Sequence, residues 1–199
     1  ITIPSSVTSI GHNAFYACDS LAQITIPSSV TSIGQNVFTH CTSLAQIIIL
    51  SSLTSIGNYA FSDCPSLTQV TIPSSVTSIG KYAFDGCSSL TQITIPFSVT
   101  EIKDHAFSFL RSLKQITIPS SITKIGECIF FQCPSLAQII ILPCKENRLT
   151  FYENQYLLFK QDLNSENFDT FIWGAGFDGE IIIPPFIKTI NSGAFSGCS

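Results

Sequence analysis

The fold is decided by the stretch Ile24-Thr25-Ile26-Pro27-Ser28-Ser29-Val30-Thr31-Ser32-Ile33-Gly34, because the chain repeats it at a fixed spacing. Altered copies begin every 23 residues, at Ile1, Ile47, Val70, Ile93, Ile116 and Ile139, and one more begins at Ile181. A constant period of this length is typical of a solenoid, in which each repeat forms one unit and stacking buries the apolar faces of neighbours. The sequence therefore predicts an array of stacked coils.

The second repeat shows what each position does. Its apolar residues Leu21, Ile24 and Ile26 alternate with polar ones, as expected of a strand with one buried face. Pro27 ends the strand because it has no N–H for a sheet ladder. Two columns of identical residues should then run through the core. The phenylalanine column contains Phe15, Phe38, Phe61, Phe84, Phe107, Phe130 and Phe195. The isoleucine column contains Ile10, Ile33, Ile56, Ile79, Ile102, Ile125 and Ile190.

The pattern I-x-I-P-x-S-V-x-x-I-G-x-x-A-F-x-x-C-x-S-L closely resembles the BspA-like, or Treponema-type, leucine-rich repeat. The resemblance covers residues 1–142 and 181–199. It implies an α/β leucine-rich-repeat solenoid, a right-handed superhelix with a parallel β-sheet on its concave face. Helical periodicity is weak within each repeat, so we expect a short strand, a 3₁₀ turn or a single helical turn on the convex side.

The domain prediction is one continuous solenoid. Residues 1–142 hold six repeats and the start of a seventh, residues 143–180 form a non-repeat insert, and residues 181–199 resume the repeat. Within the insert, 156–160 and 170–173 read as two strands joined by the polar turn 162–169, which predicts a β-hairpin. Because the first and last residues fall inside repeats, we expect a longer array around this stretch, with any signal or anchor outside it.

Aromatic residues are concentrated in the insert, which leaves two interpretations open. Tyr156, Phe171 and Trp173, with Tyr152 and Phe177, could form an aromatic binding patch. The alternative, which we favour, is that most of them pack the insert against the solenoid. A charged cluster in the fifth repeat is likewise either a solvated ridge or a polar contact site, and its members are Glu101, Lys103, Asp104, His105, Arg111 and Lys114.

Composition excludes several classes of protein. Charged residues make up 11% of the chain and hydrophobic residues 45%, so the chain is not disordered. The net charge of −4 argues against a nucleic-acid partner, which would need a basic surface. The longest apolar runs are far shorter than the ~20 residues that cross a bilayer, so we expect no membrane insertion of this stretch.

Six of the eight cysteines share one repeat position: Cys18, Cys41, Cys64, Cys87, Cys133 and Cys198. Stacked identical positions point their side chains in parallel, which is the wrong direction for a disulfide and the wrong arrangement for zinc. We therefore predict a column of buried free thiols. Cys128 and Cys144 lie off the column, and a bridge between them stays open.

No motif indicates catalysis. The histidines His12, His40 and His105 fall at different repeat positions, and no nucleophile elbow, phosphate loop or metal-binding signature occurs. We therefore predict a protein that is not an enzyme, with no cofactor, no metal and no small-molecule substrate.

The remaining candidate is the outer face of the main sheet, where solenoids usually bind. The predicted protein-binding face consists of Gln46, Ile48, Gln69, Thr71, Gln92, Thr94, Gln115 and Thr117. The family resemblance implies an adhesion module at the cell surface that binds a host or extracellular-matrix protein. Buried free thiols would suit a cytoplasmic array equally well.

Two other hypotheses compete with adhesion. A structural array could self-associate through the open ends of its sheets. A regular threonine column could match an ice or carbohydrate lattice, but Ile48 and Ile140 interrupt that row.

Overall fold

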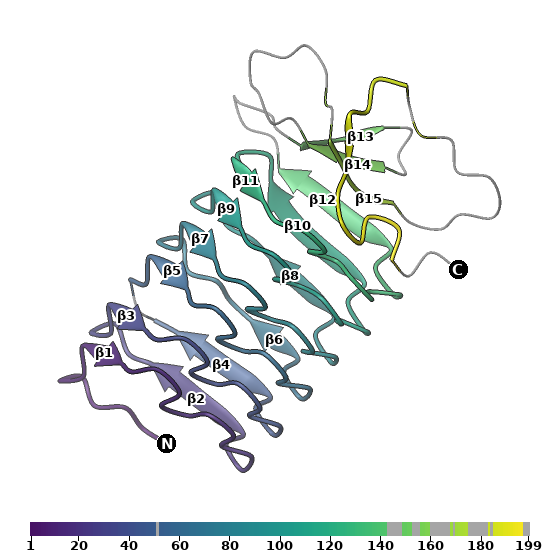
Figure 1. Ribbon diagram of the computed structural model, residues 1–199. Helices are drawn as coiled ribbons and strands as arrows, with labels where there is room; N and C mark the ends of the chain where they lie inside the picture. Colours follow the sequence, from purple (N-terminus) through teal and green to yellow (C-terminus); the bar gives the residue numbers. More distant parts are fainter. Residues whose placement is uncertain are drawn as a thin grey trace.

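The computed structural model is an elongated solenoid of parallel strands, coiled about six times, with a mixed sheet at its C-terminal end (Figure 1). The structure describes residues 1–50, 52–142, 149–152, 156–159, 168, 170–174, 183 and 185–196. Strands pair with their counterparts 23 residues away, for example Gln23 with Gln46. The predicted leucine-rich-repeat solenoid is confirmed.

The longer strands form the first side of each coil. They are β2 (Gln23–Ile26), β4 (Gln46–Ile49), β6 (Gln69–Val70), β8 (Gln92–Thr94), β10 (Gln115–Pro119) and β12 (Gln138–Leu142). They pair in parallel as two sheets of three strands, β2-β4-β6 and β8-β10-β12. Side chains alternate with period two, so Ile24, Ile47 and Ile93 are buried while the glutamines face outward.

Short strands form the second side. They are β1 (Ser9–Ile10), β3 (Ser32–Ile33), β5 (Ser55–Ile56), β7 (Ser78–Ile79), β9 (Glu101–Ile102) and β11 (Lys124–Ile125). Of the three predicted alternatives for this side, the short strand is the one adopted. No helix or 3₁₀ segment occurs among the described residues.

The third side consists of turns in which alternate N–H groups point toward the next coil. Phe38 N donates to Ala60 O (2.9 Å), Phe61 N to Ala83 O (2.8 Å) and Phe84 N to Ala106 O (2.9 Å). Every second residue donates in this way because left-handed residues recur at two positions per coil, such as Asn36 and His40. Eleven non-glycine residues adopt positive φ: Asn13, Ala17, Asn36, His40, Tyr59, Asp63, Tyr82, His105, Phe109, Cys128 and Gln132.

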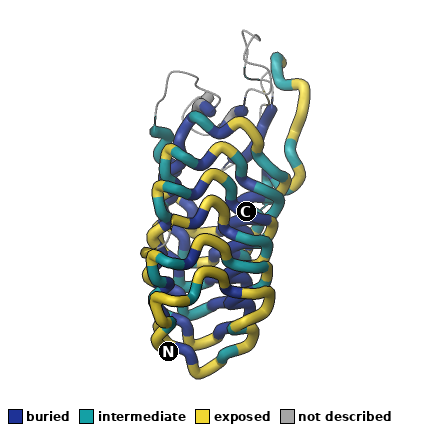
Figure 2. The backbone as a smooth tube through the Cα atoms, turned by 90° about the vertical axis from the view of Figure 1, so that its left-hand side faces the viewer, coloured by how far each residue is buried: buried dark blue, intermediate teal, exposed yellow. Residues whose placement is uncertain are grey.

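The phenylalanine column is the centre of the core. Rings from Phe15 to Phe107 stack nearly parallel, with centroids 5.2–5.7 Å apart, and Phe130 continues the stack at 6.3 Å. Figure 2 shows the interior as a continuous buried strip along the solenoid. Burial of each ring contributes about 1.5–3 kcal/mol, and each aromatic contact adds about 0.5–1.5 kcal/mol.

The described members of the cysteine column are free thiols; Cys18 in the first coil is half-buried, and the other four are buried as predicted. Each of these four buried thiols donates to a phenylalanine carbonyl of the preceding coil: Cys41 to Phe15, Cys64 to Phe38 and Cys87 to Phe61 at 3.0 Å, and Cys133 to Phe107 at 3.1 Å. Burial raises the pKa of Cys41 to about 11 and those of Cys64 and Cys133 to about 12. Cys128 is also a free thiol, whereas Cys144 lies outside the described residues.

The insert contains the predicted hairpin. Strand β14 (Tyr156–Phe159) pairs antiparallel with β15 (Thr170–Gly174), and most of the predicted turn 162–169 lies outside the described residues. The sequence analysis did not predict β13 (Leu149–Tyr152), which pairs with β14, nor the parallel pairing of β16 (Thr189–Ile190) with β15. Leu149, Leu157, Phe159, Ile172 and Trp173 belong to the same core as the coils, so this sheet covers the end of that core.

The resumed repeat stacks on the sixth coil. Cys128 N donates to Ser192 O and Asn191 Nδ2 donates to Gly126 O, both at 2.9 Å. The bond from Cys128 N to Ser192 O takes the place of a regular inter-coil bond. In the regular array such a bond joins residues 22 apart, as His105 N and Glu127 O are. The chain therefore leaves the array for the insert and returns to continue the same turn side.

Candidate protein-binding face

The outward glutamines form an ordered row on the first side of the solenoid. Gln23, Gln46 and Gln69 lie opposite one another in one sheet, and Gln92, Gln115 and Gln138 do so in the other. Gln46, Gln69 and Gln92 are exposed, whereas Gln115 is half-buried. The strands thus bring together the amides that the sequence analysis assigned to the face.

Fewer residues are exposed than predicted in the second row of the face, which consists of Ile48 and the threonines. Ile48, Thr71 and Thr94 are exposed, with Ile48 at 37%. Thr117 lies in register with the exposed Thr94 but is only 9% exposed, so it contributes little to the accessible surface. All of β10 beyond Gln115 is buried. The longest stretch of the face without such burial runs from β2 to β8, and Gln138 on β12 is exposed beyond it.

The strands of the face, β2, β4, β6, β8, β10 and β12, carry no charged side chain. Charges lie on the other sides, where Lys81 pairs with Asp104 (2.7 Å) and Lys124 with Glu101 (3.8 Å). The hydrogen bond from Lys81 lowers the pKa of Asp104 and raises that of Lys81. Two acids of the fifth-repeat cluster are therefore paired with lysines of adjacent coils, as in a solvated ridge.

The turn side also holds a polar hollow of about 370 Å³ that the sequence did not reveal. Asp63, Asp85, Phe109 and Arg111 line it. Burial raises the pKa of Asp85, although a hydrogen bond from the buried Ser108 opposes this shift. Asp63 lies 3.6 Å from His40, so its carboxylate already has a neighbour.

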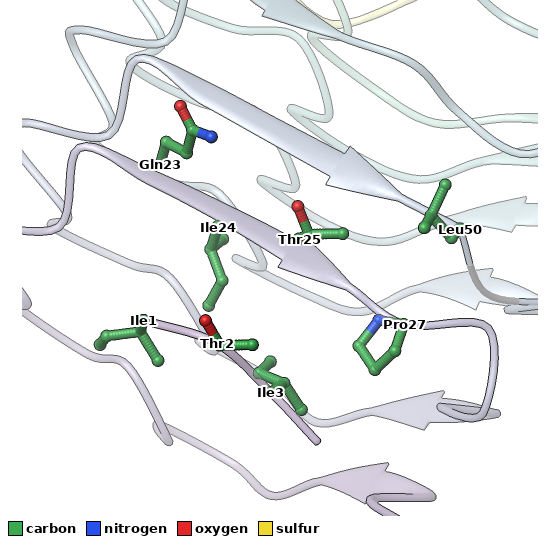
Figure 3. A pocket seen from close by; sticks show the side chains of 8 residues that line it. All are labelled: Ile1, Thr2, Ile3, Gln23, Ile24, Thr25, Pro27 and Leu50. Atoms are coloured by element: carbon green, nitrogen blue, oxygen red, sulfur yellow. The ribbon is translucent and has the colours of Figure 1, made fainter. Parts of the chain in front are cut away.

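Two hollows open on the sheet face itself, at equivalent repeat positions. The first, of about 390 Å³, separates residues 1–3 from β2 (Figure 3). Gln23 and Thr25 line it from β2, and Leu50 lines it from the end of the next strand. A single bridge, Thr2 with Thr25, joins the two segments there.

The second hollow lies between β6 and β8 and has a volume of about 340 Å³. Residues 69–72, 92–94 and Pro96 line it. These two strands belong to different sheets, so the face is divided at this point. The division cannot be predicted from the repeat, because Gln69, Thr71, Gln92 and Thr94 all fit it.

Comparison with known proteins places these features in a family. The profile of the BspA type leucine rich repeat region matches six copies, over residues 1–108 and 54–170. The chain belongs to this BspA-type repeat family. No curated protein matches it.

Solved BspA-like relatives are bacterial leucine-rich repeat proteins. The crystal structure of the T. pallidum leucine rich repeat protein is 34% identical, with a TM-score of 0.68, over 72% of this chain and 69% of that chain. A leucine-rich repeat protein from Bacteroides ovatus is 38% identical, with a TM-score of 0.63, over 67% of this chain. The match spans about a third (34%) of the Bacteroides chain.

In the second candidate patch of this BspA-type protein, the two residues whose side chains the structure describes are buried. Phe171 is fully buried against Phe195 (ring centroids 4.7 Å apart). Trp173 is 7% exposed and meets Phe130 edge-on at 6.2 Å. The alternative interpretation, packing of the insert against the solenoid, is therefore correct for Trp173. The side chains of Tyr152, Tyr156 and Phe177 lie outside the described residues.

Among the described residues, no group of three or more His, Cys, Asp or Glu side chains could hold a metal ion. The histidines are dispersed along the BspA-type array: His12 Nδ1 accepts from Gln35 N (2.8 Å), and His105 stacks on Tyr82 (4.6 Å). None of the described residues forms a helix long and apolar enough to span a bilayer.

Proposed function

We propose that this chain is a non-catalytic protein-binding module of a cell-surface protein, and that it binds host or extracellular-matrix proteins through the sheet face between β2 and β8. The observation that carries the proposal is the exposed, in-register row of Gln46, Gln69 and Gln92. The surface location and the class of partner come from the BspA-like resemblance.

The chemistry of the face supports a protein partner. Amide and hydroxyl groups can both donate and accept, and no charged group has to be desolvated when a partner covers the strands. Ile48 and Leu50 add exposed apolar area beside the polar row, at 37% and 60% exposure. A central apolar contact with hydrogen bonds around it is a common arrangement in protein interfaces.

Solid-phase binding to a panel of purified extracellular-matrix and host-cell surface proteins tests the proposal. The test variant changes Gln46, Ile48 and Gln69 to alanine. The control variant changes four exposed residues of the other sides to alanine: Gln35, Gln132, Thr8 and Thr54. Circular dichroism spectra of both variants should match that of the unaltered protein.

We expect saturable binding that the face variant loses and the control variant keeps. Binding that survives in the face variant would transfer the function to another surface. No binding to any protein of the panel would contradict the adhesion proposal. Concentration-dependent oligomers in light scattering, together with that result, would favour the structural array.

A further inference from the structure

The division between β6 and β8 leaves main-chain groups without partners. At the neighbouring junctions, Thr68 N donates to Ala45 O (3.2 Å) and Lys114 N donates to Thr91 O (2.9 Å). The equivalent bond from Thr91 N to Thr68 O is missing, and no hydrogen bond joins residues 68–72 to residues 91–95 in the described structure. We call this interval the seam.

The seam is confined to one side of the solenoid. On the second side, β5, β7 and β9 pair without interruption. On the turn side, Phe61 N donates to Ala83 O and Phe84 N to Ala106 O across the same coils. These bonds hold the coils together, so the seam cannot widen by a whole strand, which would need roughly 9.6 Å between β6 and β8. An extended peptide therefore cannot enter it as an additional strand.

The lining of the seam determines which ligand it suits. Gln69, Thr71, Gln92 and Thr94 are exposed and supply amides and hydroxyls. Unpaired N–H and C=O groups lie between them, and buried Val70 and Ile93 form an apolar floor. No lining residue is charged, so a charged ligand would lose water without gaining an ion pair.

Neutral polyhydroxylated ligands match this combination. A sugar hydroxyl donates and accepts, so one ring can satisfy N–H and C=O groups at the same time. The carbon face of the ring can cover the apolar floor. We propose that the seam is a binding site for one sugar ring of a neutral oligosaccharide. The proposal does not depend on the protein-binding function, and it differs from lattice binding because it needs no uninterrupted threonine row.

Nuclear magnetic resonance titration of ¹⁵N-labelled protein tests the site. The probes are cellotetraose, maltotetraose, mannotetraose and chitotetraose, with a capped tetra-alanine peptide as a non-sugar. We expect one of the sugars to shift the amides of Val70, Ile72 and Thr94 saturably. The same amides should exchange with deuterium faster than that of Ile24, which lies in a paired strand.

Two variants separate the seam from the rest of the face. Changing Gln69 and Gln92 to alanine should raise the dissociation constant roughly tenfold, because side-chain hydrogen bonds are lost. Changing Gln115 and Gln138, at the equivalent positions of the paired junction between β10 and β12, should leave the constant unchanged. The proposal is overturned if no sugar saturates these shifts, if both variants weaken binding equally, or if only the peptide produces the shifts.

Discussion

Left-handed backbone positions set the shape of the turn side at the scale of single residues. Two such positions occur in each coil, and glycine occupies only Gly86 and Gly193 among the described residues. A side chain in this conformation costs about 1–2 kcal/mol, so most coils carry this strain. The strain persists because each left-handed residue donates its own N–H to the next coil, as Asn36 and His40 do, and the residue midway between them, Phe38, donates in the same direction.

Gly86→Ala should destabilise the protein by about 1–2 kcal/mol, because φ is +71° and the new Cβ would lie 2.6 Å from Asp63 Oδ1. Urea unfolding followed by circular dichroism measures the loss. The double variant with Asp63→Ala removes the contact but keeps the backbone strain, so it should recover part of the loss. Full recovery of the lost stability would show that the positive φ of residue 86 contributes nothing to the effect of Gly86→Ala.

The buried thiols predict how stability depends on pH. Burial raises the pKa of Cys64 and of Cys133 from 9.0 to about 12, while the thiols of the unfolded chain keep their ordinary pKa. Below pH 9 both states hold the proton, and stability is unaffected. As the pH rises from 9 toward 12, the unfolded chain loses protons that the folded chain retains, so stability falls by about 1.4 kcal/mol per pH unit and thiol.

Unfolding free energies measured from pH 8 to 11 test this expectation. A variant with Cys64 and Cys133 changed to alanine should show a shallower fall, whatever its stability at pH 8. An unchanged slope of the unfolding free energy against pH would show that groups other than these two thiols cause the loss of stability.

At the scale of elements, the mixed sheet of β13 to β16 closes the core that six coils leave open. Trp173, the single tryptophan, lies on Phe130 at the end of the phenylalanine column. The insert therefore provides apolar cover where a seventh regular coil would otherwise be needed.

Trp173→Ala should cost about 3–5 kcal/mol and expose the sixth coil, because it removes a large buried side chain beside Phe130. Proteolysis under native conditions should then cut first near β11 and β12. Trp173→Phe keeps most of the apolar cover and should resist cleavage. Equal resistance of both variants would show that the ring does not protect the coil.

The same elements show how far the sequence predicts the structure. Each regular strand is marked by a repeat, so the columns Ile24–Ile47 and Phe38–Phe61 and the free thiols follow from the 23-residue period. The hairpin follows from its two apolar runs. By contrast, β13 lies in a segment without periodicity, and nothing in the repeat distinguishes the buried Thr117 from the exposed Thr94. The seam is equally hidden, because its residues obey the repeat while their hydrogen bonds do not.

At the scale of the whole molecule, each coil contacts mainly its two neighbours, so stability propagates along one dimension. Phe84→Ala, in the middle of the ring stack, should cost about 3–5 kcal/mol and divide the array into parts that unfold separately. Hydrogen exchange measured by mass spectrometry should then show two levels of protection on either side of the fourth coil.

Phe15→Ala is the matched control, because its ring lies at the first coil and is only half-buried. It should lower protection near residues 1–23 and leave one cooperative transition for the remaining coils. A single transition in the Phe84 variant would contradict the one-dimensional description.

The common direction of the N–H groups on the turn side has an electrical consequence. At the first junction, three donors, Asn13, Phe15 and Ala17, all point toward the second coil, and later coils repeat this orientation. Each aligned peptide carries a dipole of about 3.5 D, and dipoles aligned head to tail add as they do in a helix. The turn side is therefore polarised along the solenoid axis, with carbonyl oxygens at its N-terminal end and amide hydrogens at its C-terminal end. Inter-coil N–H groups on the second side, such as those of Thr31 and Gly34, point the opposite way, so the dipole belongs to the turn side and not to the whole solenoid. Each added coil would lengthen this dipole without increasing the partial charge at either end.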